Sequence, residues 1–311
     1  MAMPSLQLTF VPVGVCYVCG ETRHVPAFIR ESYGYQFHWV RCASCHLLYQ
    51  DPKLSRESLN DVYNSPIYWQ HDGQRTGESQ RLGYQDYTAG DSYRLRQAQV
   101  RLKTVLRYLA PNAKVLDVAC ATGSFVKVAR NAGVDATGID LSAAMVGFGK
   151  QAYGIPLTVG DFDSAEIAPA SLDGVTIWGA DSNFFDPRFT LTRAHSVLRP
   201  GGYLFFNFWD FDHVSRPLRG SFKLGCNALY NFNRSNIVRL LSSIGFETSR
   251  MTHEWQYATL DAVLFMTDHP FIRALVHRLG WADRIVRLPT LSGFVVVARK
   301  HPEMAAGGTA R

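Results

Sequence analysis

Long hydrophobic runs are missing from this sequence. No stretch approaches the ~18 consecutive apolar residues of a bilayer-spanning helix, and the start, MAMPSLQLTF, lacks the basic, apolar and small-residue order of a secretory signal. We therefore expect a soluble, cytoplasmic protein. Charge of one sign is also scarce, since the net charge is only +6 and the isoelectric point is near 9.0. This modest surplus favours anionic partners without requiring nucleic acid.

The composition excludes both a disordered chain and a very small fold. Of 311 residues, 47% are hydrophobic and 19% are charged, which is far from the composition of chains that stay unfolded. At roughly 150 residues per domain, this length indicates about two domains, or one large domain with an appendage.

Cysteine is also scarce, but its spacing is informative. Four of the six cysteines form two C-x-x-C pairs: Cys16, Cys19, Cys42 and Cys45. Two such pairs, 22 residues apart, can place four thiolates around one Zn²⁺ ion. Redox dithiols and, through the CASCH motif, attachment of a c-type haem are the alternatives, in that order. Cys120 and Cys226 stand alone and are expected to be small buried side chains.

A short hairpin is expected between the two cysteine pairs. Apolar and aromatic residues from Val25 to Val40 flank Tyr33 and Gly34, as two strands around a turn would. Residues 1–55 are therefore predicted to be a zinc-ribbon module. A module this small needs the ion and the rest of the chain for its stability.

Residues 56–92 are predicted to be a helix followed by a linker or lid. Ser55 can cap a short helix, and a polar loop from residue 64 to residue 92 follows it. The loop contains an unusual number of aromatic residues, namely Tyr68, Trp69, Tyr84 and Tyr87. Such a loop covers a ligand or is simply a packed surface loop.

Strands and helices alternate over residues 93–300, which we predict to be the main domain. Strands are expected at VLDVA, ATGID, PLTVG, GVTIW, YLFFNF, FETSR and GFVVVARK, with helices between most of them. Such alternation predicts an α/β fold, a doubly wound, mostly parallel, seven-stranded Rossmann-like sheet. Residues 301–311 are expected to be a disordered tail.

The candidate ligand site lies at the ends of the first three strands, where open parallel sheets bind small ligands. The first strand leads into an aspartate followed by small residues at alternating positions: Asp117, Ala119, Ala121 and Gly123. Asp140 ends the second strand, where a carboxylate can accept both hydroxyl hydrogens of a ribose. Asp161 and Phe162 follow the third strand and suit an adenine amine and ring. These residues predict an adenosine-containing ligand.

A nicotinamide cofactor is the obvious alternative, because its ribose carboxylate occupies a comparable position. However, the fingerprint G-x-G-x-x-G is absent after the first strand. Asp117 stands there instead, and its carboxylate suits a ligand with an ammonium group and repels a pyrophosphate.

Residues 91–300 resemble the Rossmann-like S-adenosylmethionine-dependent methyltransferases through VLDVACATG, GID, GDF and LRPGG. With CASCHLLYQDP and ALYNFNRSNIVRLLSSIGF, the whole layout is similar to bacterial small-molecule methyltransferases of sugar, polysaccharide or natural-product biosynthesis. The resemblance implies that Asp117 and the loop to Gly123 surround the methionine moiety. Asp140 would bind the ribose, and Asp161 and Phe162 the adenine. The residues from Trp178 to Asp181 would flank the methyl group.

Two departures from the family pattern matter. Ala119 and Ala121 stand where the family usually has glycine, and a Cβ there narrows the loop and disfavours positive φ. Asn183 stands where the family often has histidine, so a base is missing at that point. The remaining candidates for a catalytic base are His213, Asp181 and Tyr230, whereas His195 ranks below His213 as a residue of an amphipathic helix.

The expected reaction is O- or C-methylation of a small-molecule acceptor, and the basic charge balance favours an anionic one. Residues 251–289 would help to shape the acceptor side. Their apolar and basic run FIRALVHRLGWADRIVRLP is expected to be a packed surface helix, and a contact with a lipid surface is the less favoured alternative. An RNA methyltransferase or nucleic-acid-binding protein is the alternative function, although the ribbon lacks a dense Lys/Arg stripe. A catalytically silent binding module is a third class, and the sequence does not reveal the oligomeric state.

Overall fold

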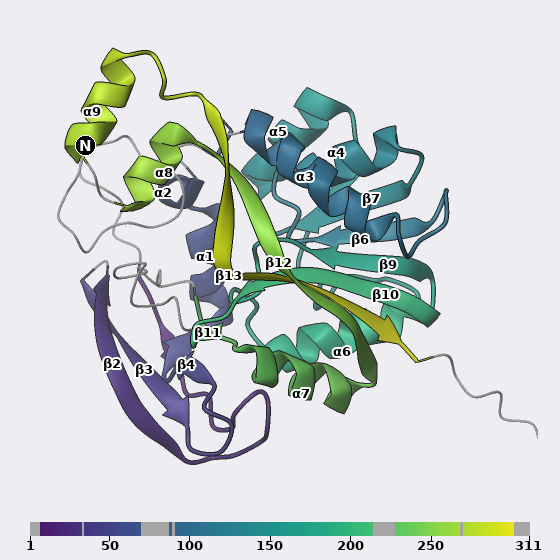
Figure 1. Ribbon diagram of the computed structural model, residues 1–311. Helices are drawn as coiled ribbons and strands as arrows, with labels where there is room; N and C mark the ends of the chain where they lie inside the picture. Colours follow the sequence, from purple (N-terminus) through teal and green to yellow (C-terminus); the bar gives the residue numbers. More distant parts are fainter. Residues whose placement is uncertain are drawn as a thin grey trace, which may run out of the picture.

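The structure is a computed structural model that describes residues 7–32, 34–69, 87–88, 91–213, 228–267 and 270–301. Its largest element is a seven-stranded sheet with the order β12-β13-β10-β9-β6-β7-β8 (Figure 1). In chain order its strands are β6 (Lys114–Val118), β7 (Asp135–Asp140), β8 (Leu157–Val159), β9 (Leu172–Ile177), β10 (Leu198–Trp209), β12 (Phe246–Thr259) and β13 (Ile285–Lys300). The strands from β6 to β10 are parallel, and β13 is antiparallel to both neighbours. The predicted mostly parallel, Rossmann-like sheet is confirmed.

Helices cover both faces of this sheet (Figure 1). They are α3 (Asp91–Val105), α4 (Ser124–Asn131) and α5 (Ala143–Tyr153), and on the opposite side α6 (Pro187–Val197) and α7 (Arg234–Ile244). Their ends follow local sequence signals. The side chain of Asp186 caps α6, and Gly245 ends α7 at a φ of 105° that favours glycine.

The N-terminal residues form two small sheets. The strands are β1 (Phe10–Val11), β2 (His24–Ser32), β3 (Tyr35–Cys42), β4 (Leu48–Gln50), β5 (Lys53–Leu54) and β11 (Tyr230–Asn231). The hairpin predicted between the cysteine pairs is present as β2 and β3. The sequence did not reveal that β11, from the main domain, pairs with β4 and completes a four-stranded sheet. Residues 7–54 therefore share a sheet and a hydrophobic core with the main domain.

Two predictions about connecting segments need correction. The loop expected from residue 64 contains a helical turn, α2 (Pro66–Trp69), directly after α1 (Arg56–Asn64). Pro66 fits the first turn of a helix because no hydrogen bond from its nitrogen is needed there. The rest of the proposed lid, including Tyr84, lies outside the described residues apart from residues 87–88 and 91–92.

The segment 251–289 is also more regular than expected. Strand β12 continues to Thr259 and pairs with β13 as far as Ile285, so a long ribbon extends beyond the sheet. The burial pattern of β12 is similar where the strand lies within the sheet and where it continues beyond it. This pattern therefore does not mark the point at which the strand leaves the sheet. At the end of the ribbon lie α8 (Leu260–Thr267) and α9 (Pro270–Arg278). None of the helices in the described ranges has the length and hydropathy needed to span a bilayer.

Candidate active site

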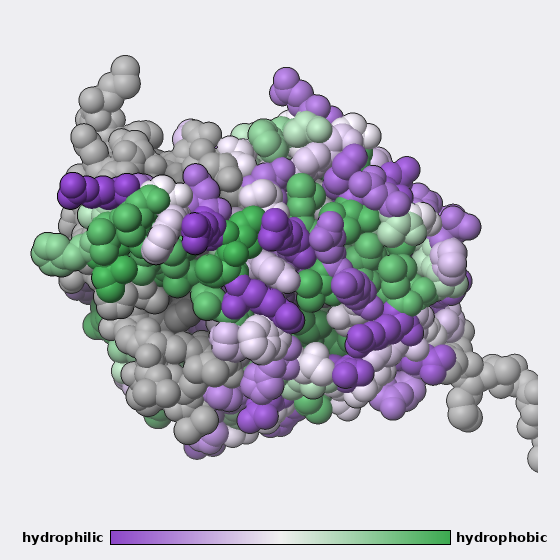
Figure 2. All heavy atoms as spheres, turned by 45° about the horizontal axis from the view of Figure 1, so that its top comes forward, coloured by the Kyte–Doolittle hydropathy of each residue, from purple (hydrophilic) through white to green (hydrophobic). Residues whose placement is uncertain are grey.

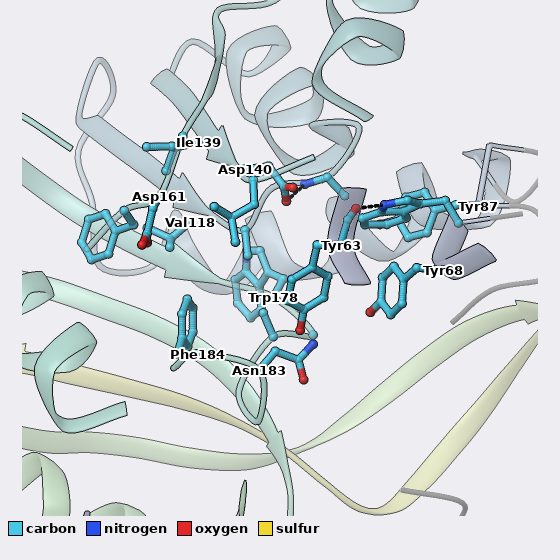
Figure 3. Close-up of a pocket in the computed structure, with 18 residues that line it drawn as sticks. Tyr63, Tyr68, Tyr87, Val118, Ile139, Asp140, Asp161, Trp178, Asn183 and Phe184 are labelled. Atoms are coloured by element: carbon cyan, nitrogen blue, oxygen red, sulfur yellow. Dashed lines mark hydrogen bonds between the residues drawn. The ribbon is translucent and has the colours of Figure 1, made fainter. Parts of the chain in front are cut away.

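A pocket that opens to solvent lies at the carboxyl ends of β6, β7, β8 and β9 (Figure 3). Six predicted residues line it: Ala119, Ala121, Asp140, Asp161, Phe162 and Trp178. The parallel strands bring these residues together because their carboxyl ends meet at one edge of the sheet. Gly179 and Ala180, from the segment expected to flank the methyl group, also line the pocket. Tyr63, Ile139 and Phe184 belong to the lining too, and the sequence did not single them out.

Asp140 is held firmly at the rim of the pocket. Its two oxygens accept hydrogen bonds from the backbone N–H groups of Ala121 and Ser142, both at 2.8 Å. Burial raises the pKa of the Asp140 carboxyl above its ordinary value, although these two bonds oppose the shift. A carboxylate offers about four acceptor positions, so Asp140 can still accept hydrogen bonds from two hydroxyl groups.

Replacing Asp140 tests this arrangement. Hydrogen bonds to a charged group contribute about 1.5–3 kcal/mol, so we expect Asp140→Asn to weaken binding of S-adenosylhomocysteine by roughly 10- to 100-fold. Calorimetric titration would measure the change. Asp135→Asn is the matched control, because Asp135 is exposed at the other end of the same strand. Equal affinities for all three proteins would exclude Asp140 from the binding site.

Both alanines of the loop after β6 have backbone angles that disfavour a side chain. The φ angle is 56° at Ala119 and 47° at Ala121, in the left-handed region that costs a non-glycine residue about 1–2 kcal/mol. The loop thus keeps the conformation expected of a glycine-rich sequence although it carries two Cβ atoms. The steric concern raised by the sequence is real, and the structure accommodates it.

Glycine at these positions should relieve the strain. We expect Ala119→Gly to leave the free energy of unfolding unchanged or to raise it by up to about 1 kcal/mol, because the relief exceeds the added freedom of the unfolded chain. Chemical denaturation would measure this change. Ala129→Gly, in the buried face of α4, should lower the free energy of unfolding by about 1 kcal/mol. A similar loss for both variants would contradict the inferred strain.

Gly123 and Asp117 support the pocket from behind and do not line it. Gly123 has a φ of 73°, in the left-handed region that favours glycine, and a Cβ there would also press on the ends of the Ile155 and Leu157 side chains at 2.8 Å. The Asp117 carboxyl is 3% exposed and accepts a 2.6 Å hydrogen bond from the hydroxyl of Thr176. Burial raises the pKa of Asp117 from 3.8 to about 7, and the hydrogen bond from Thr176 opposes the shift.

This pKa predicts a pH dependence. Between pH 3.8 and about 7 the folded protein holds a proton on Asp117 that the unfolded chain has lost. The contribution of Asp117 to the free energy of unfolding must therefore fall as the pH rises through this window and stay constant above it. We expect wild type to lose stability relative to Asp117→Asn, which keeps an acceptor for Thr176. Urea unfolding of both proteins at several pH values measures this difference, and a difference that is independent of pH would contradict the assignment.

Asp161 is linked to the N-terminal part of the chain. Arg56, the first residue of α1, donates to the Asp161 carboxylate at 2.6 Å. The other Asp161 oxygen accepts from the backbone of Asp163 at 3.0 Å. Phe162 is buried beside it and offers a flat apolar surface. The contact with Arg56 was not apparent in the sequence, since 105 residues separate the two side chains.

Aromatic residues from α1, α2 and the segment after it form one wall of the pocket (Figure 3). They are Tyr63, Tyr68, Trp69 and Tyr87. Their rings meet edge to face in sequence, with centroids 4.8–5.1 Å apart, and the indole of Trp69 donates to the carbonyl of Tyr63 at 2.6 Å. Of the four aromatic residues in the predicted lid, Tyr68, Trp69 and Tyr87 therefore line the pocket, and Tyr84 lies outside the described residues.

A buried polar cluster supports the opposite wall. Glu254 accepts hydrogen bonds from the Arg101 guanidinium at 2.8 and 3.0 Å, from Gln97 at 3.0 Å and from Asn207 at 2.9 Å. The oxygen of Asn207 accepts in turn from the N–H of Gly179, in the pocket lining, at 2.7 Å. The cluster joins α3, β10 and β12 directly behind the pocket.

None of the three candidate bases belongs to the lining formed by the described residues. Tyr230, in β11, is fully buried, and its ring packs against that of Tyr17 in the N-terminal module with centroids 5.6 Å apart. The ring of His213 packs near His253 and Phe294, with centroids 6.1 and 6.2 Å away. Asp181 lies beside the lining residue Ala180, and burial raises the pKa of its carboxyl to about 7.

The structure separates His195, which lies away from the pocket, from Asn183, which lines it. His195 packs against Phe246 at 5.0 Å, far along α6, as expected for a structural histidine. Asn183 lines the pocket. Its side-chain oxygen accepts from the hydroxyl of Ser182 at 2.9 Å, so an amide stands where the family pattern often has a base.

The four paired cysteines converge at one point. The sulfur atoms of Cys16, Cys19, Cys42 and Cys45 all lie within 4.8 Å of one another. The sulfurs of Cys16 and Cys45 are 3.5 Å apart, and those of Cys19 and Cys42 are 3.4 Å apart. A tetrahedral zinc site with Zn–S bonds of about 2.3 Å has sulfurs about 3.8 Å apart, so the observed set fits one ion.

The main domain holds both cysteine turns in place. Arg188, on α6, donates to the carbonyls of Tyr17 and Val18, both at 2.7 Å. Asn236, on α7, donates to the carbonyl of Cys45 at 2.8 Å. Each of the two C-x-x-C segments is therefore held by a hydrogen-bonding side chain of the main domain.

Comparison with known proteins identifies the fold and the chemistry. A family model described as a methyltransferase domain matches residues 91–284. The chain belongs to this methyltransferase family. The enzyme is an S-adenosylmethionine-dependent methyltransferase, as its relatives also indicate.

The relatives methylate quinone precursors according to their names. The demethylmenaquinone methyltransferase of Paenarthrobacter aurescens is 28% identical to this methyltransferase over 188 residues, 60% of this chain and 68% of that protein. The ubiquinone/menaquinone biosynthesis C-methyltransferase of Geotalea daltonii is 35% identical over 103 residues, 30% of this chain and 44% of that protein. A crystal structure of an S-adenosylmethionine-dependent methyltransferase from Archaeoglobus fulgidus matches with a TM-score of 0.48 at 17% identity and covers 68% of this chain and 97% of that one.

Proposed function

We propose that this methyltransferase transfers the methyl group of S-adenosylmethionine to the oxygen or carbon of a small molecule with a flat apolar part. The observation that carries the proposal is the composition of the pocket. Polar residues of the strand ends line one side of it, and four aromatic rings line another (Figure 3). The first side suits an adenosine, and the second suits a planar acceptor.

The residues of the pocket fit the donor. Asp140 has free acceptor positions for ribose hydroxyls, and Phe162 with the Asp161 carboxylate suits the adenine ring and its amine. Bound S-adenosylmethionine supplies a methyl group on a positively charged sulfur, which is already activated for transfer. The task of the protein is to align the acceptor with that group, and alignment alone can lower the barrier by about 7–11 kcal/mol.

The class of acceptor follows from the aromatic wall. The edges and faces of Tyr63, Tyr68 and Trp69 offer apolar surface with few polar groups, which favours a quinone-like or aromatic natural-product intermediate over an unmodified sugar. The quinone precursors named for the relatives are the first compounds to try. We assign no described residue of the lining as a base, because an acceptor that has already lost its proton, such as a phenolate or an enolate, can attack the methyl group directly and release S-adenosylhomocysteine.

The experiment that tests the proposal is acceptor discovery with labelled donor. The protein would be incubated with S-adenosylmethionine carrying a labelled methyl group, together with demethylmenaquinone or with fractionated bacterial extract. We expect label in an apolar or aromatic small molecule identified by mass spectrometry. Label found only in RNA or only in free sugars would overturn the proposed acceptor class. Absence of any transfer by a protein that binds the donor would indicate a silent binding module.

We also propose that the four cysteines bind one structural Zn²⁺ ion. All four positions of a tetrahedron would be occupied by sulfur, which leaves no open position for catalysis. The ion would stabilise the small N-terminal sheets. The helices α1 and α2, which carry Arg56 and three residues of the aromatic wall, follow directly after β5, the last strand of this N-terminal part. The zinc site would thus support the pocket from a distance without taking part in the transfer.

A further inference from the structure

The tip of the β12–β13 ribbon exposes more large apolar side chains than any role in the fold explains. In α9, Phe271 is 90% exposed and Leu275 is 55% exposed. Phe271, Ile272, Leu275 and Leu279 recur at helical spacing and form a single exposed stripe. Trp281 continues this surface after α9 and is 41% exposed. Figure 2 shows the apolar side chains of this region as a green area at the left of the view, flanked by purple ones.

The opposite side of α9 anchors the helix to its neighbour. Val276 is buried, and Arg273 and His277 both contact the Asp261 carboxylate of α8 at 2.6 Å. The helix is therefore fixed in an orientation that keeps the stripe of Phe271, Ile272 and Leu275 outward. Contiguous exposed apolar surface held in this way marks an interaction site.

Cationic side chains border the stripe. Arg278, Arg284 and Arg287 are exposed and form no ion pair with another described residue. Arg284 lies over the ring of Trp281 at 4.7 Å and Arg287 over the ring of Trp255 at 4.8 Å. From residue 270 to residue 288, Asp283 is the sole acidic residue in the sequence. Tryptophan beside arginine at the edge of an apolar helix face is the combination that suits the boundary between lipid headgroups and acyl chains.

We infer that α9 and the adjoining end of the β12–β13 ribbon bind the surface of an anionic lipid membrane. The apolar stripe would enter the acyl boundary and the three arginines would contact anionic headgroups. A second copy of this chain is a poorer occupant, because two copies of the surface would bring like charges together. Figure 1 shows α8 and α9 beyond the same end of the sheet as α1 and α2. An acceptor dissolved in the membrane would therefore approach the pocket from the end of the molecule that contacts the lipid. The inference does not require any particular acceptor.

Vesicle flotation with the full chain tests the inference. We expect binding to vesicles of phosphatidylcholine mixed with phosphatidylglycerol to exceed binding to phosphatidylcholine alone by more than about tenfold at low salt, and to weaken as salt is raised. Phe271→Ser with Ile272→Ser should reduce binding about tenfold or more, and Arg278→Glu should reduce it on anionic vesicles. Phe189→Ser and Arg239→Glu are matched controls, because both residues are exposed on helices of the main domain.

The outcomes separate this inference from its competitors. Equal binding of wild type and the Phe271, Ile272 and Arg278 variants, or no binding of wild type to anionic vesicles, overturns it. A concentration-dependent dimer that the Phe271→Ser change abolishes, with no vesicle binding, would assign the surface to a second copy instead. Donor affinity, measured by calorimetry, should be unchanged in every variant. A protein that does not bind vesicles would therefore leave the proposed function standing, and a protein that transfers no methyl group could still bind vesicles.

Discussion

Replacing Cys16 with serine should remove the zinc ion and strongly destabilise the N-terminal sheet. Serine is a poor zinc ligand at neutral pH, and a module this small depends on its metal for folding. Because β11 and β4 share one sheet and one core joins the two parts, the effect should extend to the main domain. We expect a metal content near zero and a fall of several kcal/mol in the free energy of unfolding.

The matched control for this experiment is Cys120→Ala. Cys120 is also buried but stands outside the cluster, with its sulfur near Gly138. Its replacement should leave about one zinc per chain, as measured by mass spectrometry of the metal. A Cys16→Ser protein with full metal content and unaltered melting would exclude the four-sulfur site. Chelation of wild type should reproduce the Cys16→Ser result.

The second large effect is expected at Glu254. Removing its carboxylate leaves the buried guanidinium of Arg101, 84% covered, without its partner, and such losses typically cost about 3–5 kcal/mol. Asn207 would also lose a bond, and with it part of the support for Gly179 in the pocket. We therefore expect Glu254→Ala to lower the free energy of unfolding by about 3–5 kcal/mol and to weaken donor binding.

Glu247→Ala is the matched control for Glu254→Ala. Glu247 lies on the same strand, β12, but its side chain is exposed, so its loss should change stability by less than about 0.5 kcal/mol. Denaturant unfolding measures both variants. If Glu254→Ala is no more destabilising than Glu247→Ala, the buried cluster is not a structural support of the pocket.

Local patterns sufficed for the main sheet and for the polar half of the pocket. Alternating apolar strands and capped helices repeat along residues 114–209, and the topology of a parallel sheet brings successive strand ends together. Asp140 and Asp161 could therefore be placed near one another from their position after each strand. Four cysteines with this spacing could likewise be placed around one point.

Contacts between distant segments could not be predicted in this way. The pairing of β11 with β4 and the bond from Arg56 to Asp161 each join residues more than 100 positions apart, and nothing in the local pattern marks them. Glu254 is a single polar residue within a strand, and its burial depends on partners from α3 and β10. The same limitation applies to His213, which lies outside the described pocket lining, because position after a strand does not reveal which way the chain turns next.

Calorimetric titration of the folded protein with S-adenosylhomocysteine tests directly whether this pocket binds the methyl donor. We predict one binding site per chain for wild type and a clear loss of affinity for Asp140→Asn, while Asp135→Asn binds as wild type does. No heat with this compound, together with saturable binding of NADH, would contradict it.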